Sequence, residues 1–220
     1  MVEEKTSKEK IKKRVLSRYV SSLHMNDIYK SPIVQDPIIS SRPLYESVYP
    51  IVCPRDLEWV IDAHLNCSKK ERSNTRKWDR KTPYYVHPIW CATTFSTETT
   101  INPYVKMAGS QALLFHDVLE DTTKGLPKYL DRTVLEIIQD MTFEGGSEQE
   151  MEEIWEKDSF IKLLKLYDKV SNLLDGKWMG KEKREIYEKY TELLCRDVTF
   201  NYGELNILRI AESIIKGDRK

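Results

Sequence analysis

A histidine and three carboxylates lie close together on an otherwise apolar segment, residues 112–122 (ALLFHDVLEDT). His116 directly precedes Asp117, and Glu120 and Asp121 follow one helical turn later. At 3.6 residues per turn, Glu120 is i+4 from His116 and Asp121 is i+4 from Asp117, so the four side chains share adjoining faces. Mutually repelling carboxylates on an apolar helix are costly unless a cation or water compensates them. The cluster indicates either a cation site or an acidic helix end in solvent, and the helix dipole disfavours the second.

Two further polar residues indicate a functional site only when they are considered together with that cluster. His87 precedes Pro88 in the segment 82–90 (TPYYVHPIW), where a lone histidine is more often structural or a helix cap. Asp168 interrupts the apolar stripe of the segment 160–176, where an isolated aspartate is usually a paired surface residue. In chain order, however, the three segments present histidine, then histidine-aspartate, then aspartate.

This ordered pattern resembles that of the HD superfamily of metal-dependent phosphohydrolases. The segments TPYYVHPI, LLFHDVLEDT and KLLKLYDKVSNL are similar to T-P-Y-x-x-H-P-I, L-L-H-D-x-x-E-D-T and K-L-x-K-L-A-D-K-x-x-N-L of RelA/SpoT-type hydrolase domains and small alarmone hydrolases. The resemblance covers about residues 55–197. It implies a hydrolase that removes the 3′-diphosphate of guanosine tetra- or pentaphosphate, the nucleotides of the stringent response.

The resemblance also implies roles for individual residues. It gives a metal site of two imidazoles and two carboxylates, His87, His116, Asp117 and Asp168. It makes Glu120 and Asp121 the pair that handles the attacking water. Such a mixed nitrogen and oxygen site suits Mn²⁺ or a similar ion and leaves positions open for water and a phosphate oxygen. Because no histidine follows residue 116, we expect one ion. The other histidines, His24 and His64, are not expected in the site.

A basic loop, residues 69–81, leads into the first of these segments. It holds seven basic and two acidic residues, which suits a polyanionic substrate but would equally suit a solvated charged loop. The resemblance makes Arg76 and Lys77 the pair that contacts the nucleotide. On the helix of the last aspartate, Asn172 is placed to bond the ribose. Lys165 is placed either to meet a phosphate or to be an ordinary surface lysine.

The segments of the sequence that carry these residues show the pattern of helices. Apolar residues recur at helical spacing, and the chain shows no alternating runs with hairpin dipeptides, so we predict an all-α, HD-domain helical fold. We divide the chain into residues 1–54, an N-terminal helix (7–29) with a proline-rich wrapping segment, and residues 55–220, the hydrolase domain. Helices are expected at 55–67, 87–96, 104–120, 127–141, 148–156, 158–175, 181–197 and 203–216, with Pro127 in the first turn of its helix.

Composition narrows the class of protein. The chain has 220 residues with 35 basic and 35 acidic side chains, and this balance argues against a general nucleic-acid or membrane-surface binder. It lacks an apolar run long enough for a membrane span and the apolar core of a signal peptide, so we expect a cytoplasmic protein. The four cysteines show no C-x-x-C spacing and are expected to be ordinary thiols. The sequence leaves a homo-oligomer open.

Two alternatives remain open at this point. The substrate could be another nucleotide, such as an adenosine polyphosphate, NADPH or a nucleoside monophosphate, because HD sites distinguish substrates through their pockets. Residues 142–150 (TFEGGSEQE) depart from the family pattern, which leaves the base preference undecided. The chain could also be a non-catalytic, nucleotide-sensing helical protein, although the complete set of polar residues argues against that. The role of residues 1–54 is not indicated.

Overall fold

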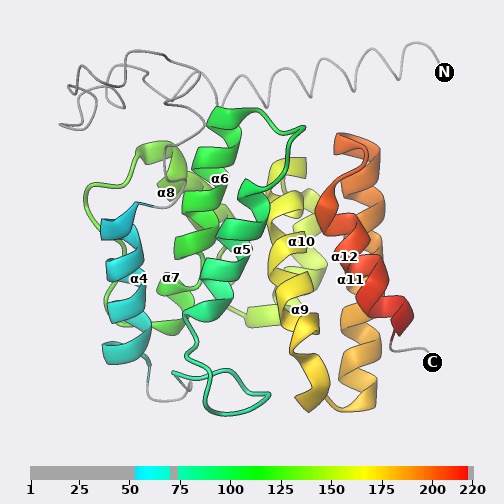
Figure 1. The fold of residues 1–220 in the computed structure, drawn as a ribbon, viewed down its shortest axis with the longest axis horizontal. Helices are drawn as coiled ribbons and strands as arrows, with labels where there is room; N and C mark the ends of the chain where they lie inside the picture. The colour runs from blue at the N-terminus through cyan, green and yellow to red at the C-terminus, as the bar shows by residue number, and fades with distance from the viewer. Residues whose placement is uncertain (1–52, 70–73, 218–220) are drawn as a thin grey trace. The chain divides into compact units, whose positions relative to one another are not determined.

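The structure is a computed structural model that describes residues 53–69 and 74–217. In this part of the chain it shows helices and isolated bridges but no strand, so the expected all-α fold is confirmed. The elements are α4 (Pro54–Asn66), α5 (Val86–Ser96), α6 (Pro103–Phe115), α7 (Val118–Asp121), α8 (Arg132–Met141), α9 (Gly146–Glu153), the 3₁₀ turn η2 (Ile154–Glu156), α10 (Ser159–Leu174), the 3₁₀ turn η3 (Gly176–Trp178), α11 (Lys181–Tyr202) and α12 (Asn206–Gly217) (Figure 1).

Helix α10 forms the centre of this arrangement. It packs against α5, α8, α11 and α12, and Figure 1 shows it between α5 and the pair α11 and α12. Twelve of its 16 residues are buried, and among them Leu163, Leu166 and Tyr167 are fully enclosed. Since the helix is buried on nearly every side, its charged residues cannot all reach water. They must be paired inside the protein.

Side-chain caps set where several helices begin. Asp158 accepts a hydrogen bond from the backbone N–H of Phe160 at the start of α10. Asp131 accepts one from the N–H of Thr133, so α8 begins at Arg132. The expectation that Pro127 lies in the first turn of this helix is therefore wrong.

The helix expected over residues 104–120 is broken at the histidine-aspartate pair. Helix α6 ends at Phe115, and the short α7 begins at Val118. The Nδ1 atom of His116 lies 2.7 Å from the carbonyl oxygen of Leu113. In a continuous helix that oxygen would accept the N–H of Asp117, so the imidazole competes with the helical hydrogen bond. The break turns His116 and Asp117 out of the regular helical pattern.

A buried carboxylate ties the C-terminal helix to the core. Glu98 accepts hydrogen bonds from the hydroxyl of Tyr167 at 2.6 Å and from the backbone N–H groups of Asn206 and Ile207 at 3.0 and 3.1 Å. Those two N–H groups belong to the first turn of α12, where they have no helical acceptor. Glu98 therefore caps α12 from a distant part of the chain and links it to α10.

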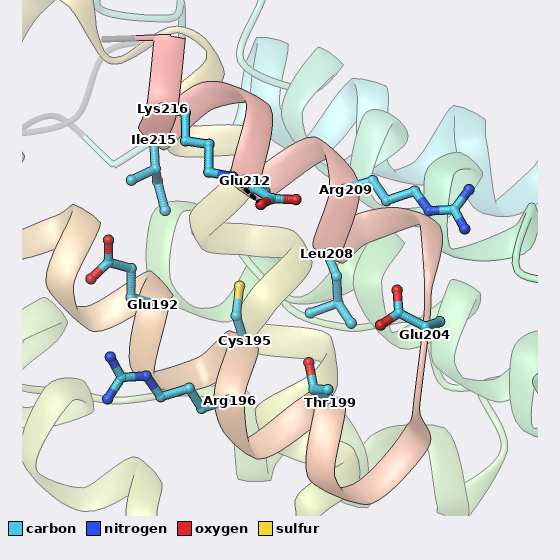
Figure 2. A pocket seen from close by; sticks show the side chains of 10 residues that line it. All are labelled: Glu192, Cys195, Arg196, Thr199, Glu204, Leu208, Arg209, Glu212, Ile215 and Lys216. Atoms are coloured by element: carbon cyan, nitrogen blue, oxygen red, sulfur yellow. Dashed lines mark hydrogen bonds and ion pairs between the residues drawn. The ribbon is translucent and has the colours of Figure 1, made fainter. Parts of the chain in front are cut away.

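A pocket of about 530 Å³ lies between α11 and α12. Figure 2 shows Cys195 among charged side chains of both signs, including Arg196, Glu204 and the ion pair of Lys216 with Glu212. Burial raises the pKa of the Cys195 thiol to about 12, so the thiol stays protonated at neutral pH. Two other pockets lie in this part of the chain, one lined by Asp121 among others and one by His87. None of their lining residues lines the pocket between α11 and α12.

The helix expected over residues 7–29 and most of the proline-rich segment lie outside the described residues. Residues 52–220 form one compact unit, and the division at residue 54 stays a prediction. None of the described helices is long and apolar enough to cross a membrane.

Candidate active site

Four side chains from three parts of the chain converge: His87 in the first turn of α5, His116 and Asp117 at the break after α6, and Asp168 on α10. His87 Nε2 lies 3.4 Å from Asp117 Oδ2 and 3.3 Å from Asp168 Oδ1. His116 Nε2 lies 3.2 Å from Asp117 Oδ1 and 3.9 Å from Asp168 Oδ1. All four residues are buried. The structure therefore brings together the four residues that the sequence pattern predicted as metal ligands.

The Nδ1 atom of each imidazole contacts a neighbouring residue, and this contact fixes the orientation of the ring. His116 Nδ1 contacts the carbonyl oxygen of Leu113, and a carbonyl can only accept, so Nδ1 carries a proton and Nε2 is the nitrogen left to bind an ion. His87 Nδ1 lies 2.8 Å from the hydroxyl oxygen of Ser171. Both Nε2 atoms are buried without a hydrogen-bond partner among the described residues. Imidazole nitrogens without a hydrogen bond that lie beside carboxylates are the donor set of a divalent ion. Histidines that bind a metal through one ring nitrogen typically hydrogen-bond through the other, as both do here through Nδ1.

The distances and charges fit such an ion. His87, His116 and Asp117 each offer one ligand atom, and these atoms lie within 4.8 Å of one another. Burial by itself would raise the pKa of Asp117, but the charges of His116 and His87 lower it to about 2. Burial would lower the pKa of His116, but Asp117 and Asp168 raise it to about 9. The carboxylates thus favour positive charge at this point, which either a proton or a metal ion can supply.

The second oxygen of Asp168 faces away from the imidazoles. Asp168 Oδ2 lies 3.3 Å from Lys165 Nζ and 3.2 Å from Lys169 Nζ. Both lysines are buried and also contact Glu150. The alternative that Lys165 is a surface lysine is therefore wrong. The structure places it behind Asp168, and its contact with a phosphate stays a prediction.

A pocket of about 430 Å³ is lined by two residues that hydrogen-bond to the proposed ligands, Tyr84 to Asp117 and Asn172 to Asp168. Its polar lining includes the cations Arg76, Lys77 and Lys183, together with Asp121 and Asn172. Its aromatic side chains include Trp178, whose ring centre lies 4.6 Å from Lys77 Nζ. Three cations and an aromatic ring in the lining suit a polyanionic ligand with a planar group.

Arg76 is not part of a solvated charged loop. It is buried, donates to both carboxylate oxygens of Asp175 and donates to Asn172 Oδ1 at 3.0 Å. Asn172 Nδ2 in turn donates to Asp168 Oδ1 at 2.7 Å. Arg76 and Asn172 therefore connect the wall of the pocket to the proposed metal ligands.

The two adjacent acids that the sequence singled out face different surroundings. Asp121 is buried and lines the pocket. Glu120 is half-buried, and its Oε1 accepts a hydrogen bond from the backbone N–H of Phe143 at 3.1 Å. Burial raises the pKa of Glu120. Of the pair, Asp121 is the carboxylate that a molecule in the pocket would meet.

Sequence reasoning assigned no role to two residues that border the site. The hydroxyl of Tyr84 donates to Asp117 Oδ2 at 2.8 Å, and its place in the TPYYVHPI segment was the available signal. The ring of His64 lies 5.1 Å from the ring of Tyr84. Burial lowers the pKa of His64 to about 4, so its imidazole is neutral at neutral pH. His24 lies outside the described residues.

Comparison with known proteins identifies the family of the chain. No family model matches the chain. The chain is 32% identical over 125 residues to the human (Homo sapiens) guanosine-3′,5′-bis(diphosphate) 3′-pyrophosphohydrolase MESH1, covering 53% of this chain and 68% of that protein. A solved structure described as a metazoan orthologue of SpoT that hydrolyses ppGpp and plays a role in starvation responses is 22% identical. The two structures match with a TM-score of 0.58 over 74% of this chain and 93% of the solved chain. This match confirms the HD-domain helical fold. From its identity to the human protein over two thirds of that protein's length, this chain belongs to the HD-domain family of guanosine-3′,5′-bis(diphosphate) 3′-pyrophosphohydrolases.

Proposed function

We propose that this chain hydrolyses the 3′-diphosphate of guanosine tetra- or pentaphosphate, giving GDP or GTP and pyrophosphate. The observation that carries the proposal is the convergence of two unpartnered imidazole nitrogens and two carboxylates beside a pocket with three cations. The name of the human relative, a 3′-pyrophosphohydrolase of this nucleotide, supports it.

The proposed ligands hold one divalent ion, for which we propose Mn²⁺: His87, His116, Asp117 and Asp168. A bound ion would supply Lewis acidity toward a phosphoryl oxygen and would make water more acidic. The imidazoles bind through Nε2 because their Nδ1 atoms are engaged by Leu113 and Ser171. Tyr84 orients Asp117 by donating to its Oδ2.

The remaining pocket residues handle the substrate and the proton. Asp121 accepts the proton of the attacking water, since it is the acid of its pair that lines the pocket. Glu120, whose Oε1 bonds the backbone of Phe143, supports the turn that carries Asp121. Lys77 and Lys183 compensate the charge of the other phosphates, and Arg76 binds the nucleotide at the wall of the pocket.

The proposed function also defines the bond that breaks. Water adds to the phosphorus next to the ribose and gives up a proton, the bond between that phosphorus and the 3′ oxygen breaks, the 3′ oxygen takes up a proton, and the diphosphate leaves intact. A phosphomonoesterase would place a terminal phosphate at the ion and release orthophosphate instead. A cytoplasmic location stays a prediction of the sequence, which left the choice between guanine and adenine undecided.

A substrate panel with Mn²⁺ tests the proposal. Guanosine tetraphosphate, its adenosine analogue, NADPH and nucleoside monophosphates are compared, and the products are identified by phosphorus NMR or ion chromatography. We expect pyrophosphate and GDP from guanosine tetraphosphate, and no turnover by the His116→Ala variant prepared in the same way. Orthophosphate as the sole inorganic product, or binding of the nucleotide without turnover, would overturn the assignment.

A further inference from the structure

Asp168 belongs to a buried cluster of charges, which it contacts through Oδ2, the oxygen that does not contact the imidazoles of His87 and His116. The cluster contains two acids and two lysines, Glu150, Asp168, Lys165 and Lys169, so its formal charge is zero. All four are at most 4% exposed. Glu150 comes from α9, whereas the other three lie on α10. The cluster is therefore balanced only because a second helix contributes a carboxylate.

Each lysine contacts both carboxylates. Glu150 Oε2 lies 2.8 Å from Lys169 Nζ and 3.2 Å from Lys165 Nζ. The same two nitrogens lie 3.2 and 3.3 Å from Asp168 Oδ2. The other oxygen of Glu150 accepts a hydrogen bond from the hydroxyl of Tyr190 at 3.0 Å, so both oxygens are fixed. Of these four contacts between a lysine and a carboxylate, two are thus made by Glu150 and two by Asp168.

The surroundings of the lysines exclude water. Lys165 Nζ lies 5.3 Å from the ring centre of Phe143, and Lys169 Nζ lies 5.8 Å from that of Tyr187, which also lines the pocket. With little water to screen it, a change of one charge at Glu150 is felt strongly at Asp168 and at an ion bound beside it.

We propose that Glu150 is a positioning residue for the metal site. It balances the charge of the two lysines that contact Asp168 Oδ2, so that the positive charge beside the proposed ligands does not exceed the negative charge and Asp168 Oδ1 stays available to the ion. This inference rests on the proposed function and adds to it a residue from α9, in the segment where the sequence departs from the family pattern. Without the charge of Glu150, two buried cations would face one carboxylate. That excess positive charge would repel a divalent ion.

The test measures the dissociation constant of Mn²⁺ by isothermal titration calorimetry without nucleotide. In Glu150→Gln, which keeps the shape and removes the charge, Mn²⁺ should bind about 10- to 100-fold more weakly, as for other residues that support metal ligands. In Glu150→Asp, which keeps the charge, binding should be closer to wild type. Glu152→Gln makes the same change at an exposed position of α9 and should leave binding within about twofold.

A second substitution separates charge balance from a merely structural role. In Glu150→Gln with Lys169→Met the cluster is neutral again, so Mn²⁺ binding should recover at least about tenfold relative to Glu150→Gln alone, reversing the loss expected for a residue that supports the ligands. The double variant also decides the matter if Glu150→Gln fails to fold. Unchanged Mn²⁺ affinity in Glu150→Gln, or a folded double variant that still binds weakly, would overturn the proposal. A wild-type chain that binds Mn²⁺ without releasing pyrophosphate would instead refute the proposed function and leave this inference standing.

Discussion

Loading the proposed metal site should raise the unfolding temperature, and the size of this effect can be worked out. At a free Mn²⁺ concentration of 100 times the dissociation constant, binding to the folded state alone stabilises it by about 2.7 kcal/mol. The compact unit spans residues 52–220, and in proteins of that size each kcal/mol raises the melting temperature by about 2–4 °C. We therefore expect a rise of roughly 5–11 °C over the chelated protein.

Differential scanning calorimetry with a chelator and with Mn²⁺ measures this rise within each variant, so a lower starting stability does not confuse the result. His116→Ala removes one of four proposed donors and should reduce the rise to less than about 2 °C, because the same Mn²⁺ concentration would no longer saturate the site. Asp121→Asn changes a pocket residue outside the donor set and should keep the rise. An equal rise in His116→Ala and wild type would show that the ion binds elsewhere.

The remaining predictions concern the pocket and the core. Asp121→Asn should lower kcat by a factor on the order of 10² or more through loss of the proton acceptor, with Mn²⁺ affinity retained; normal turnover in rapid-quench measurements would contradict this. Arg76→Ala should raise KM by about tenfold or more with a smaller change in kcat, because Arg76 is proposed to bind the nucleotide, and steady-state kinetics check this. Gly109→Ala should destabilise the fold by about 1–3 kcal/mol in urea unfolding, since a Cβ atom would lie 2.5 Å from Phe95 Cε1. A change below about 0.5 kcal/mol there would show that Phe95 moves freely.

Local signals in the sequence predicted most of the helices. Pro54 and Pro103 are the first residues of α4 and α6, and Asp158 precedes α10, so these starts lie within one residue of the expected ones. The break at His116 was not predicted, because it depends on which acceptor the imidazole nitrogen finds in the folded chain. A periodicity argument contains no such information.

Burial around α10 explains why the sequence could not exclude a surface position for Lys165. An apolar stripe on one face of a helix indicates one packed side, and a lysine off that stripe is normally exposed. Here neighbours cover the helix on nearly all sides, so Lys165 and Lys169 are enclosed. Their partner Glu150 lies in a segment without a family match, so no motif pointed to it. Helical spacing places Lys165 and Lys169 one turn apart on α10, but only the packing of α9 brings Glu150 to them.

The amide of Asn172 shows how the metal site and the pocket depend on each other. The sequence assigned this residue to the ribose, but in the structure both ends of its amide are engaged, Nδ2 with Asp168 and Oδ1 with Arg76. An amide has a second N–H and a second lone pair, so a ribose hydroxyl can bond only to what remains. A nucleotide that draws Asn172 toward itself would therefore act on a proposed metal ligand and on the pocket wall together.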